Sequence, residues 1–211
     1  MAKKVHDQEL LRAFLHSLLH SLLLVLMLLA TRALGARVLV TLILFDCAIE
    51  FAKISPKARR FIYYSRYSPF SYVTREEEKS EHDIHAAMSG LCGMLAVELF
   101  FPMFLTPAML TLAFADPLAR ILGKRFGKKR ILKTQKTFIG SGVFWCVAAI
   151  ILFSTGAPVL TSLFVGIAAA ILEIFSWSEK RYILVFQDNF LIPTGVAVGL
   201  FLSTYFTSIP F

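Results

Sequence analysis

The chain has 211 residues, of which 57% are hydrophobic and 17% are charged, and its formal net charge is +8. Soluble domains contain roughly 45–50% apolar and about 25% charged residues, so the composition excludes an ordinary soluble domain. Apolar runs recur along the whole length and leave only short connections between them. We therefore expect a single membrane-embedded domain over residues 1–211.

Seven segments are long and apolar enough to be helices that cross a bilayer. In chain order they are 13–30, 33–51, 84–101, 103–122, 138–153, 158–177 and 190–206. The third and fourth meet at Phe101-Pro102-Met103, and because proline cannot continue a helix, they must turn tightly and lie antiparallel. The predicted fold is all-α, a polytopic helical bundle with about seven transmembrane helices.

Lysine and arginine predict the orientation of this bundle. Twenty of the 22 fall on one side if the N-terminus is cytoplasmic: those before residue 13, between 53 and 79, between 120 and 136, and at 180 and 181. The other side receives only Arg32 and Arg37. Cationic loops stay in the cytoplasm, so this distribution predicts the orientation of the bundle. Because the sequence shows no targeting peptide, we expect an integral protein of the plasma (inner) membrane or the endoplasmic reticulum membrane. Its N-terminus and its three long loops would be cytoplasmic.

The cationic loops lie beside anionic lipid headgroups and within reach of phosphorylated metabolites. Their charge either binds such metabolites or only sets the topology and binds lipid. The loop at 53–79 mixes cations with aromatic residues, which suits a segment at the membrane interface: Lys57, Arg59, Arg60 and Arg66 lie among Tyr63, Tyr64 and Tyr67. No nucleic-acid motif is visible in the sequence, and the basic residues lie too close to the membrane to favour that partner.

Carboxylates inside spans are costly and usually face the bundle interior, so each is a functional candidate. Those predicted near the cytoplasmic half are Asp46, Glu50, Asp116, Glu173 and Asp188, whereas Glu98 lies toward the other end. Carboxylates at one depth beside a basic loop suit Mg²⁺, which binds one or two carboxylates together with phosphate oxygens of a substrate. The alternative is a set of hydrogen bonds or ion pairs between helices, with Arg12, Arg37 or Arg120 as partners.

The segment 116–142 is the most informative. In it, Gly123 and Gly127 bracket Lys124-Arg125, Lys128 follows in a cationic run, and Lys136-Thr137 lead into Gly140-Ser141 at the start of a predicted span. Glycines let backbone N–H groups approach a phosphate closely, and a helix N-terminus offers free donors to an anion. The pattern is not a Walker A motif, so the residues alone predict only a cytosolic polyphosphate site.

Several separated stretches resemble the CTP-dependent lipid kinases, the family that includes dolichol kinase, phytol kinase and the CTP-dependent diacylglycerol kinases. Its early Glu-x-x-Arg-(Lys)-x-x-His pattern is similar to Glu9, Arg12 and His16. Its central motif is similar to Asp116, Ala119, Gly123, Gly127 and Lys128, followed by Lys136, Thr137, Gly140 and Ser141. Its late acidic elements are similar to Glu173 and to Asp188-Asn189 with Pro193. The chain departs from the pattern at Ala115, where the family has glycine, and at Ala13, where it has lysine.

The resemblance implies transfer of a phosphoryl group from CTP, or another nucleoside triphosphate, to a membrane lipid alcohol: a polyprenol such as dolichol, phytol or diacylglycerol. It implies that Asp116 and Asp188 hold Mg²⁺, with Glu173 as a further catalytic residue. The nucleotide would lie against the cations and glycines of the central motif, namely Gly123, Lys124, Arg125, Gly127, Lys128, Lys136, Thr137, Gly140 and Ser141. Glu9, Arg12, His16 and Asn189 are matched without an assigned role.

Two other functions stay open. A phosphatidate-type cytidylyltransferase would transfer the nucleotidyl group of CTP to a lipid phosphate, but that family's longer signature is not found in the sequence. A transporter or lipid-binding protein without chemistry would often show internal repeats, and no convincing repeat is present. The lipid, the choice between CTP and ATP, and the formation of a homo-oligomer also stay open.

Overall fold

Helices form the whole described part of the chain, apart from short connections and one isolated bridge between Arg130 and Thr137. The computed structural model describes residues 18, 21–22, 25–26, 32–52, 55–64, 86–131, 134, 136–176 and 187–207. Its longer helices are α2 (Arg32–Ala52), α3 (Pro56–Tyr64), α5 (Ala86–Phe100), α6 (Leu105–Leu110), α7 (Asp116–Phe126), α8 (Phe138–Ser154), α9 (Val159–Phe175) and α10 (Asp188–Thr207).

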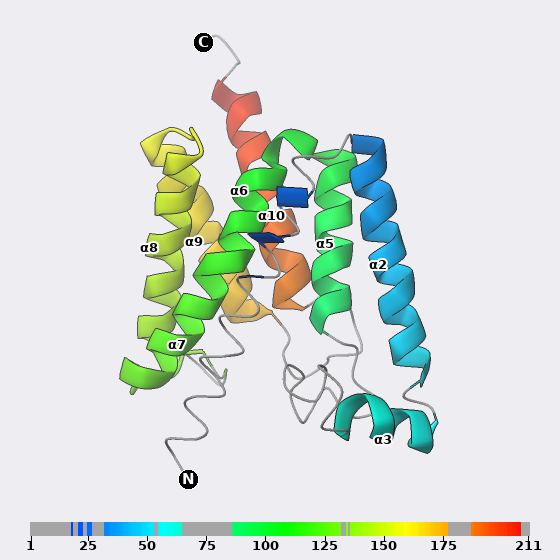
Figure 1. Cartoon of the computed structure of the whole chain (residues 1–211). Helices are drawn as coiled ribbons and strands as arrows, with labels where there is room; N and C mark the ends of the chain where they lie inside the picture. The colour runs from blue at the N-terminus through cyan, green and yellow to red at the C-terminus, as the bar shows by residue number, and fades with distance from the viewer. Residues whose placement is uncertain are drawn as a thin grey trace.

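The longer helices stand side by side, and the chain passes up and down between the two ends of the bundle (Figure 1). Helix α8 packs on α7 and α9, α10 packs on α5 and α9, and α2 packs on α5 at the edge of the bundle. The exception is α3, which lies across the lower end of the bundle in Figure 1. The loop from α7 to α8 lies at the same lower end. The end of α9 and the start of α10 lie there as well.

The all-α prediction is confirmed for the described residues. The predicted segments 33–51, 84–101, 138–153, 158–177 and 190–206 correspond to α2, α5, α8, α9 and α10 to within a few residues. The first segment, 13–30, lies almost entirely outside the described residues. Two helices, Pro102–Phe126 and Asp188–Phe206, are long and apolar enough to cross a membrane. The arrangement of seven spans stays a prediction.

The fourth predicted segment, 103–122, is not one regular helix. After the tight turn at Phe101, the backbone runs through a 3-10 turn (Pro102–Phe104), α6, a π-helical turn (Thr111–Ala115) and α7. Pro117 has no N–H to donate to the carbonyl of Ala113, and in a regular α-helix its ring would clash with that carbonyl. The π-helical turn ends directly before Asp116, and because it is wider than an α-helical turn, it accommodates Pro117. Such turns are frequent at functional sites.

Small residues let the helices approach closely, as is common where helices associate in membranes. A Cβ atom on Gly93 of α5 would lie 3.0 Å from the Cα of Phe190 in α10. A Cβ on Gly166 of α9 would lie 3.2 Å from the Trp145 ring of α8, whose Nε1 donates to the carbonyl of Leu163 at 3.2 Å. The interfaces between these helices are therefore set by backbone approach as well as by large side chains.

Apolar side chains also cover the outward faces of the bundle. On α9, Leu160 and Phe164 are each 68% exposed, and on α8 Ile150 is 66% exposed. The buried core contains similar residues, such as Phe144 and Ile192. The outside of these helices is thus as apolar as the inside, whereas soluble monomers rarely expose contiguous apolar patches of more than a few hundred Å².

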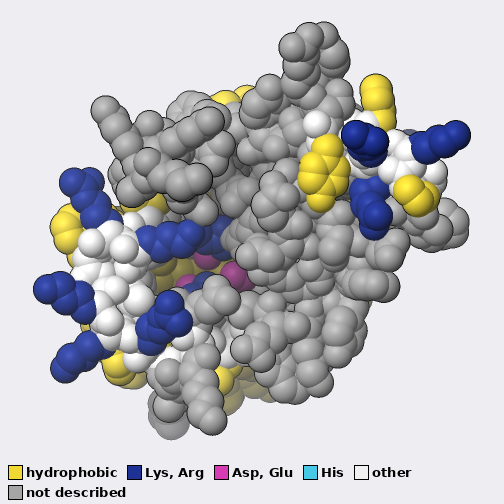
Figure 2. Space-filling model, turned by 90° about the horizontal axis from the view of Figure 1, so that it is seen from below, with side chains coloured by type: hydrophobic (Ala, Val, Ile, Leu, Met, Phe, Trp, Pro, Cys, Tyr) yellow, Lys and Arg dark blue, Asp and Glu magenta, His cyan; other side chains and the backbone are white. Residues whose placement is uncertain are grey.

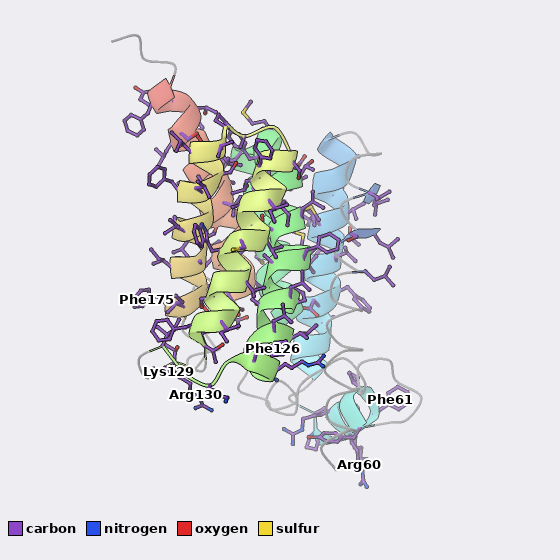
Figure 3. All side chains as sticks on the ribbon, turned by 90° about the vertical axis from the view of Figure 1, so that its left-hand side faces the viewer. Arg60, Phe61, Phe126, Lys129, Arg130 and Phe175 are labelled. Carbon is purple, nitrogen blue, oxygen red and sulfur yellow. The ribbon has the colours of Figure 1, made fainter. Side chains whose placement is uncertain are left out.

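Described cations gather at the lower end of the bundle. Figure 2 views this end and shows Lys and Arg side chains around it. They come from α3, from the end of α7 and from the loop before α8. Figure 3 labels Arg60 of α3 and Lys129 and Arg130 of the loop. Arg37 lies near the upper end of α2. Among the described cations, Arg37 thus lies at the opposite end of the bundle from those of α3, the end of α7 and the loop before α8. The predicted orientation, with the lower side cytoplasmic, stays a prediction.

Candidate functional site

Lys136 lies at the centre of a charged cluster near the lower end of the bundle. Its ammonium is ion-paired with Glu173 of α9, and its Nζ lies 3.5 Å from Oδ2 of Asp188 at the start of α10. Asp116 of α7 acts electrostatically on the same ammonium. Figure 2 shows acidic side chains in the floor of a hollow on this face, with cationic side chains beside them. Residues separated by as much as a third of the chain thus share one site.

The carboxylates keep Lys136 charged. Lys136 belongs to the loop before α8, and burial by itself lowers its pKa, because the charged form loses hydration. The negative charges of Asp188, Asp116 and Glu173 outweigh this effect and raise the pKa of Lys136 above its ordinary value of 10.5. The ammonium is therefore a fixed positive charge at neutral pH.

Glu173 joins α8 to α9 within this cluster. Its side chain is buried, and Oε2 accepts a hydrogen bond of 3.3 Å from the hydroxyl of Ser141 in the first turn of α8. The hydroxyl of Ser176 donates to the Glu173 main-chain carbonyl at 2.9 Å. Ser141 was predicted to bind the nucleotide, and in the structure its described partner is Glu173. Ser141 and Glu173 are polar residues within apolar helices, and a buried hydroxyl and a buried carboxylate each need a hydrogen-bond partner. This pattern in the sequence is the signal that could have predicted the pair.

Asp116 and Asp188 carry the other two charges. Asp116 is buried, and Oδ2 lies 3.6 Å from Arg120 one turn along α7, so the ion pair considered as an alternative for this carboxylate is present. Asp188 is half-buried, and Oδ1 accepts a hydrogen bond of 3.0 Å from the N–H of Asn189. Its position at a helix N-terminus favours a negative charge, because unpaired N–H groups point toward it. The sequence predicted both carboxylates as site residues, and the structure brings both to Lys136.

Asn189 lies where α10 meets α5. Its side chain is buried, and its main-chain carbonyl would lie 3.2 Å from a Cβ on Gly93. Pro193 cannot donate to that carbonyl, and its ring lies 3.1 Å from the same Cβ position. Gly93 was not singled out from the sequence, although Ser89 and Gly93 form a pattern of two small residues four apart that indicates close helix packing.

Three glycines and Thr137 form a tight contact between α7 and α8, which we call the glycine junction (Gly123, Gly127, Thr137, Gly140). A Cβ on Gly127 would lie 2.4 Å from both the Thr137 hydroxyl and the Gly123 carbonyl oxygen. A Cβ on Gly123 would lie 3.1 Å from the Cα of Gly140. The Thr137 hydroxyl accepts from the N–H of Gly140 at 3.1 Å, which caps the N-terminus of α8.

The junction changes the interpretation of the glycines. They were expected to present backbone N–H groups to a phosphate, but the N–H of Gly127 donates to the carbonyl of Gly123 at 2.9 Å, and that of Gly140 donates to Thr137. Both amides are thus used inside the protein. Glycine is required here because two backbones approach each other with no room for a side chain. Contact between these glycines or Thr137 and a nucleotide stays a prediction.

The remaining predicted nucleotide-binding cations form an exposed rim. Lys124 and Arg125 lie in the last turn of α7, and Lys128 lies in the turn that follows. The Arg125 guanidinium lies 5.3 Å from the centre of the Phe126 ring. Figure 2 shows cationic side chains beside the hollow on this face, with acidic side chains deeper in it.

Asp46 does not join this cluster. It is buried on α2 at the edge of the bundle, and it lies close enough to Cys92 of α5 to act electrostatically on the thiol. The charged neighbours of Lys136 are Asp188, Asp116 and Glu173. Asp46 was predicted only at a similar depth to these carboxylates, and it lies on α2, which packs on α5, so it is not among the charged groups that act on Lys136. The side chain of Glu50, like Glu9, Arg12 and His16, lies outside the described residues.

The donor set suits Mg²⁺ only together with a substrate. Within the described ranges, no group of three or more His, Cys, Asp or Glu side chains is arranged to hold a metal ion. Asp188 contacts the Lys136 ammonium, and Asp116 acts on the same ammonium electrostatically. Mg²⁺ usually takes one or two carboxylates and completes its shell with water and phosphate oxygens, so these two residues fit it.

Comparison with known proteins assigns no family. No protein-family model, curated protein or solved structure matches the chain. The resemblance to the CTP-dependent lipid kinases therefore depends on the residue pattern, and the functional argument depends on the geometry described above.

Proposed function

We propose that this protein is a polytopic membrane protein with about seven spans that transfers the terminal phosphoryl group of CTP, or another nucleoside triphosphate, to a membrane lipid alcohol. The apolar outward faces of α8 and α9 and the two helices long enough to cross a membrane support the membrane location. The gathering of cations at the lower end of the bundle supports a cytoplasmic site at that end.

One observation carries the proposed chemistry. Asp116, Lys136, Glu173 and Asp188, which come from distant parts of the sequence, meet in one cluster. These are also residues on which the resemblance to the lipid kinases depends. A purely structural set of ion pairs would explain each contact separately, but it would not explain why the motif residues share one site next to an exposed cationic rim.

The residues of the chain would share the work between them. Lys124, Arg125 and Lys128 at the rim would bind the triphosphate, and Lys136 would hold its terminal phosphate near the carboxylates. Asp116 and Asp188 would hold Mg²⁺, which neutralises charge that develops on the phosphate oxygens during transfer. The glycine junction would fix the loop that carries Lys128 and Lys136.

The acceptor would reach the same site from the bilayer. Its hydrocarbon chain would remain among the apolar helix faces, and its hydroxyl would approach the carboxylates at the lower end. Asp188, with Glu173 beside Lys136, would orient the hydroxyl and accept its proton as its oxygen bonds to the γ-phosphorus. The bond to the β-phosphate oxygen would break, and the nucleoside diphosphate would leave. Positioning and charge stabilisation are the main requirements of such a transfer.

The test uses detergent-purified protein with Mg²⁺, a panel of lipid alcohols and lipid phosphates, and CTP labelled at either the γ- or the α-phosphate. Label from the γ position in an alcohol would establish the kinase and name its acceptor. Label from the α position in a lipid phosphate would mean a cytidylyltransferase instead. Absence of label with both CTP and ATP would favour the transporter or lipid-binding alternative.

A matched pair of substitutions tests the site. Asp116→Asn removes a charge from the cluster, and we expect it to abolish turnover while the protein stays folded in detergent. Asp46→Asn makes the same change at another buried carboxylate, on α2, and we expect turnover to persist. A fully active Asp116→Asn, or equal losses in both variants, would contradict the assignment.

A further inference from the structure

Helix α3 lies across the end of the bundle. It begins at Pro56, shortly after α2 ends at Ala52. Figure 1 shows α3 running sideways, and Figure 3, turned by 90° about the vertical axis, shows it end-on. The axis of α3 is therefore roughly perpendicular to that of the bundle. Among the helices that the structure describes, none packs extensively against α3.

The nine residues of α3 combine cations with large apolar side chains and contain no acidic residue. Lys57 and Arg60 are exposed, and Phe61 is 70% exposed. In Figure 3, Phe61 projects sideways, away from the bundle, and Arg60 projects beyond its lower end. Consecutive positions on a helix are about 100° apart, so the aromatic ring and the guanidinium face different surroundings. This is the amphipathic arrangement of a helix at a membrane surface.

The depth of α3 along the bundle axis agrees with this. At the lower ends of α7, α8 and α9, the aromatic residues Phe126, Phe138 and Phe175 are exposed. Figure 3 shows that Phe126 and Phe175 precede Lys129 and Arg130 along the axis, and that α3 lies at or beyond those cations. Exposed aromatic residues followed by cations are typical of the passage from hydrocarbon to headgroups. This places α3 at the depth of the headgroups.

We propose that α3 is an interfacial helix that docks on the bilayer beside the bundle, with Phe61 among the lipid headgroups and Lys57 and Arg60 bound to anionic lipid. Charge complementarity selects this occupant, because a helix with cations and no acid is attracted to an anionic surface. The inference rests on the part of the proposed function that places the bundle in a bilayer. It does not depend on the chemistry at Lys136.

Hydrogen–deuterium exchange of the whole protein in lipid nanodiscs tests the docking, because no turnover is needed. One set of discs contains phosphatidylcholine alone, and the other adds phosphatidylserine. We expect the amides of α3 to exchange several times more slowly in the anionic discs, and high salt to remove the difference, because salt screens surface charges. Exchange in α8 should be the same in both discs and is the internal control.

Two charge-matched variants identify the surface. Lys57→Gln/Arg60→Gln removes two cations from α3, and Lys129→Gln/Arg130→Gln removes two exposed cations from the same end of the bundle. Each cation near an anionic surface contributes about a fivefold factor to binding, so the α3 variant should bind the anionic surface up to about 25-fold more weakly and lose the lipid-dependent protection. The variant at 129 and 130 should keep it.

Phe61→Ser tests the apolar part, and we expect faster exchange of α3 in both kinds of disc. Three results would overturn the proposal: α3 exchange that is independent of lipid composition, equal effects of the two charge variants, and no effect of Phe61→Ser. The first of these would mean that protein covers α3. A kinase assay on the same preparations separates this outcome from failure of the proposed function, because phosphoryl transfer can be present or absent whichever way α3 behaves.

Discussion

Replacing Lys136 with methionine tests whether the carboxylate cluster depends on its internal cation. Methionine keeps the length of the side chain and removes the charge that faces Glu173, Asp188 and Asp116. Removal of one partner from a buried ion pair costs about 3–5 kcal/mol. The side chains of Lys136 and Asp188 are 21% and 23% exposed, so some hydration remains. We therefore expect a loss of about 3 kcal/mol, at the low end of that range.

For a chain of this length, each kcal/mol shifts the midpoint of thermal unfolding by about 2–4 °C, so the expected fall is about 6–12 °C. The measurement compares the wild type, Lys136→Met and Lys136→Arg by heating in detergent at one scan rate. Arginine keeps the positive charge and should retain most of the stability. Lys129→Met, at an exposed cation of the same loop, is the control and should change the midpoint little.

A double substitution separates charge from packing. Lys136→Met/Glu173→Gln removes both charges of the closest pair, and the glutamine carbonyl can still accept the hydrogen bond from Ser141. We expect the double variant to regain most of the stability lost in Lys136→Met, because the buried carboxylate is no longer unpaired. If Lys136→Met melts with the wild type, or if the double variant is no more stable than the single one, the reasoning about the cluster is refuted.

Three further predictions concern the glycine junction and the charge of Lys136. Gly127→Ala places a Cβ 2.4 Å from the Thr137 hydroxyl and should destabilise the protein by about 1–3 kcal/mol or more in thermal unfolding. Gly142→Ala is the control, because a Cβ there meets nothing within 4 Å, and it should be neutral or stabilising. Similar unfolding midpoints for the two variants would contradict the close contact at the glycine junction. Thr137→Ala removes the cap of α8 and should cost about 1 kcal/mol by the same measurement, and Thr137→Ser should not. The pKa of Lys136 is raised above 10.5, so its ion pairs persist at every pH below that value and weaken only as the pH rises through the raised pKa. Amine acylation at about pH 9, read by peptide mass spectrometry, should therefore spare Lys136 and modify exposed Lys128; equal modification would show that Lys136 is not held as an ammonium.

Hydropathy predicted most of the helical fold because the length of an apolar run nearly determines a helix in a chain of this kind. The bounds of α8 differ from the predicted segment 138–153 by one residue, at Ser154. The tight turn at Pro102 was also predictable, since proline ends a helix wherever it cannot be accommodated. The π-helical turn before Asp116 was not predicted. Pro117 was visible in the sequence, but hydropathy does not report how a backbone widens to admit a proline.

The residues of the candidate site were easier to predict than their partners. Sequence position gives the depth of a carboxylate along the bundle, and Asp46 and Asp116 were both expected near one end. It does not say which helix lies beside which. Among the described helices, α5 is the one against which α2 packs extensively. Asp46 and Asp116 are therefore similar in type and burial but have different neighbours. Lateral arrangement is decided by side-chain fit, which periodicity does not contain.

The glycines show the same limit in another way. A glycine in a basic loop has two physical uses, exposure of a backbone amide to an anion and close approach of two backbones. The spacing of Gly123, Gly127 and Gly140 is compatible with both. In the structure, the second use accounts for all three, because each would place a Cβ within 3.1 Å of Thr137 or of a backbone atom.

The glycine junction and the charged cluster are two sides of one short segment. Thr137 has an extended backbone, with φ −114° and ψ 152°, and neighbouring side chains on extended backbone point in opposite directions. When Thr137 is held against the glycines, Lys136 is directed toward the carboxylates. The N–H of Ile131 donates to the Lys136 carbonyl at 2.9 Å and holds this strand-like segment in place. The close packing of the glycines on Thr137 thus helps to position Lys136, and this links the glycine motif of the loop to the chemistry proposed for the site.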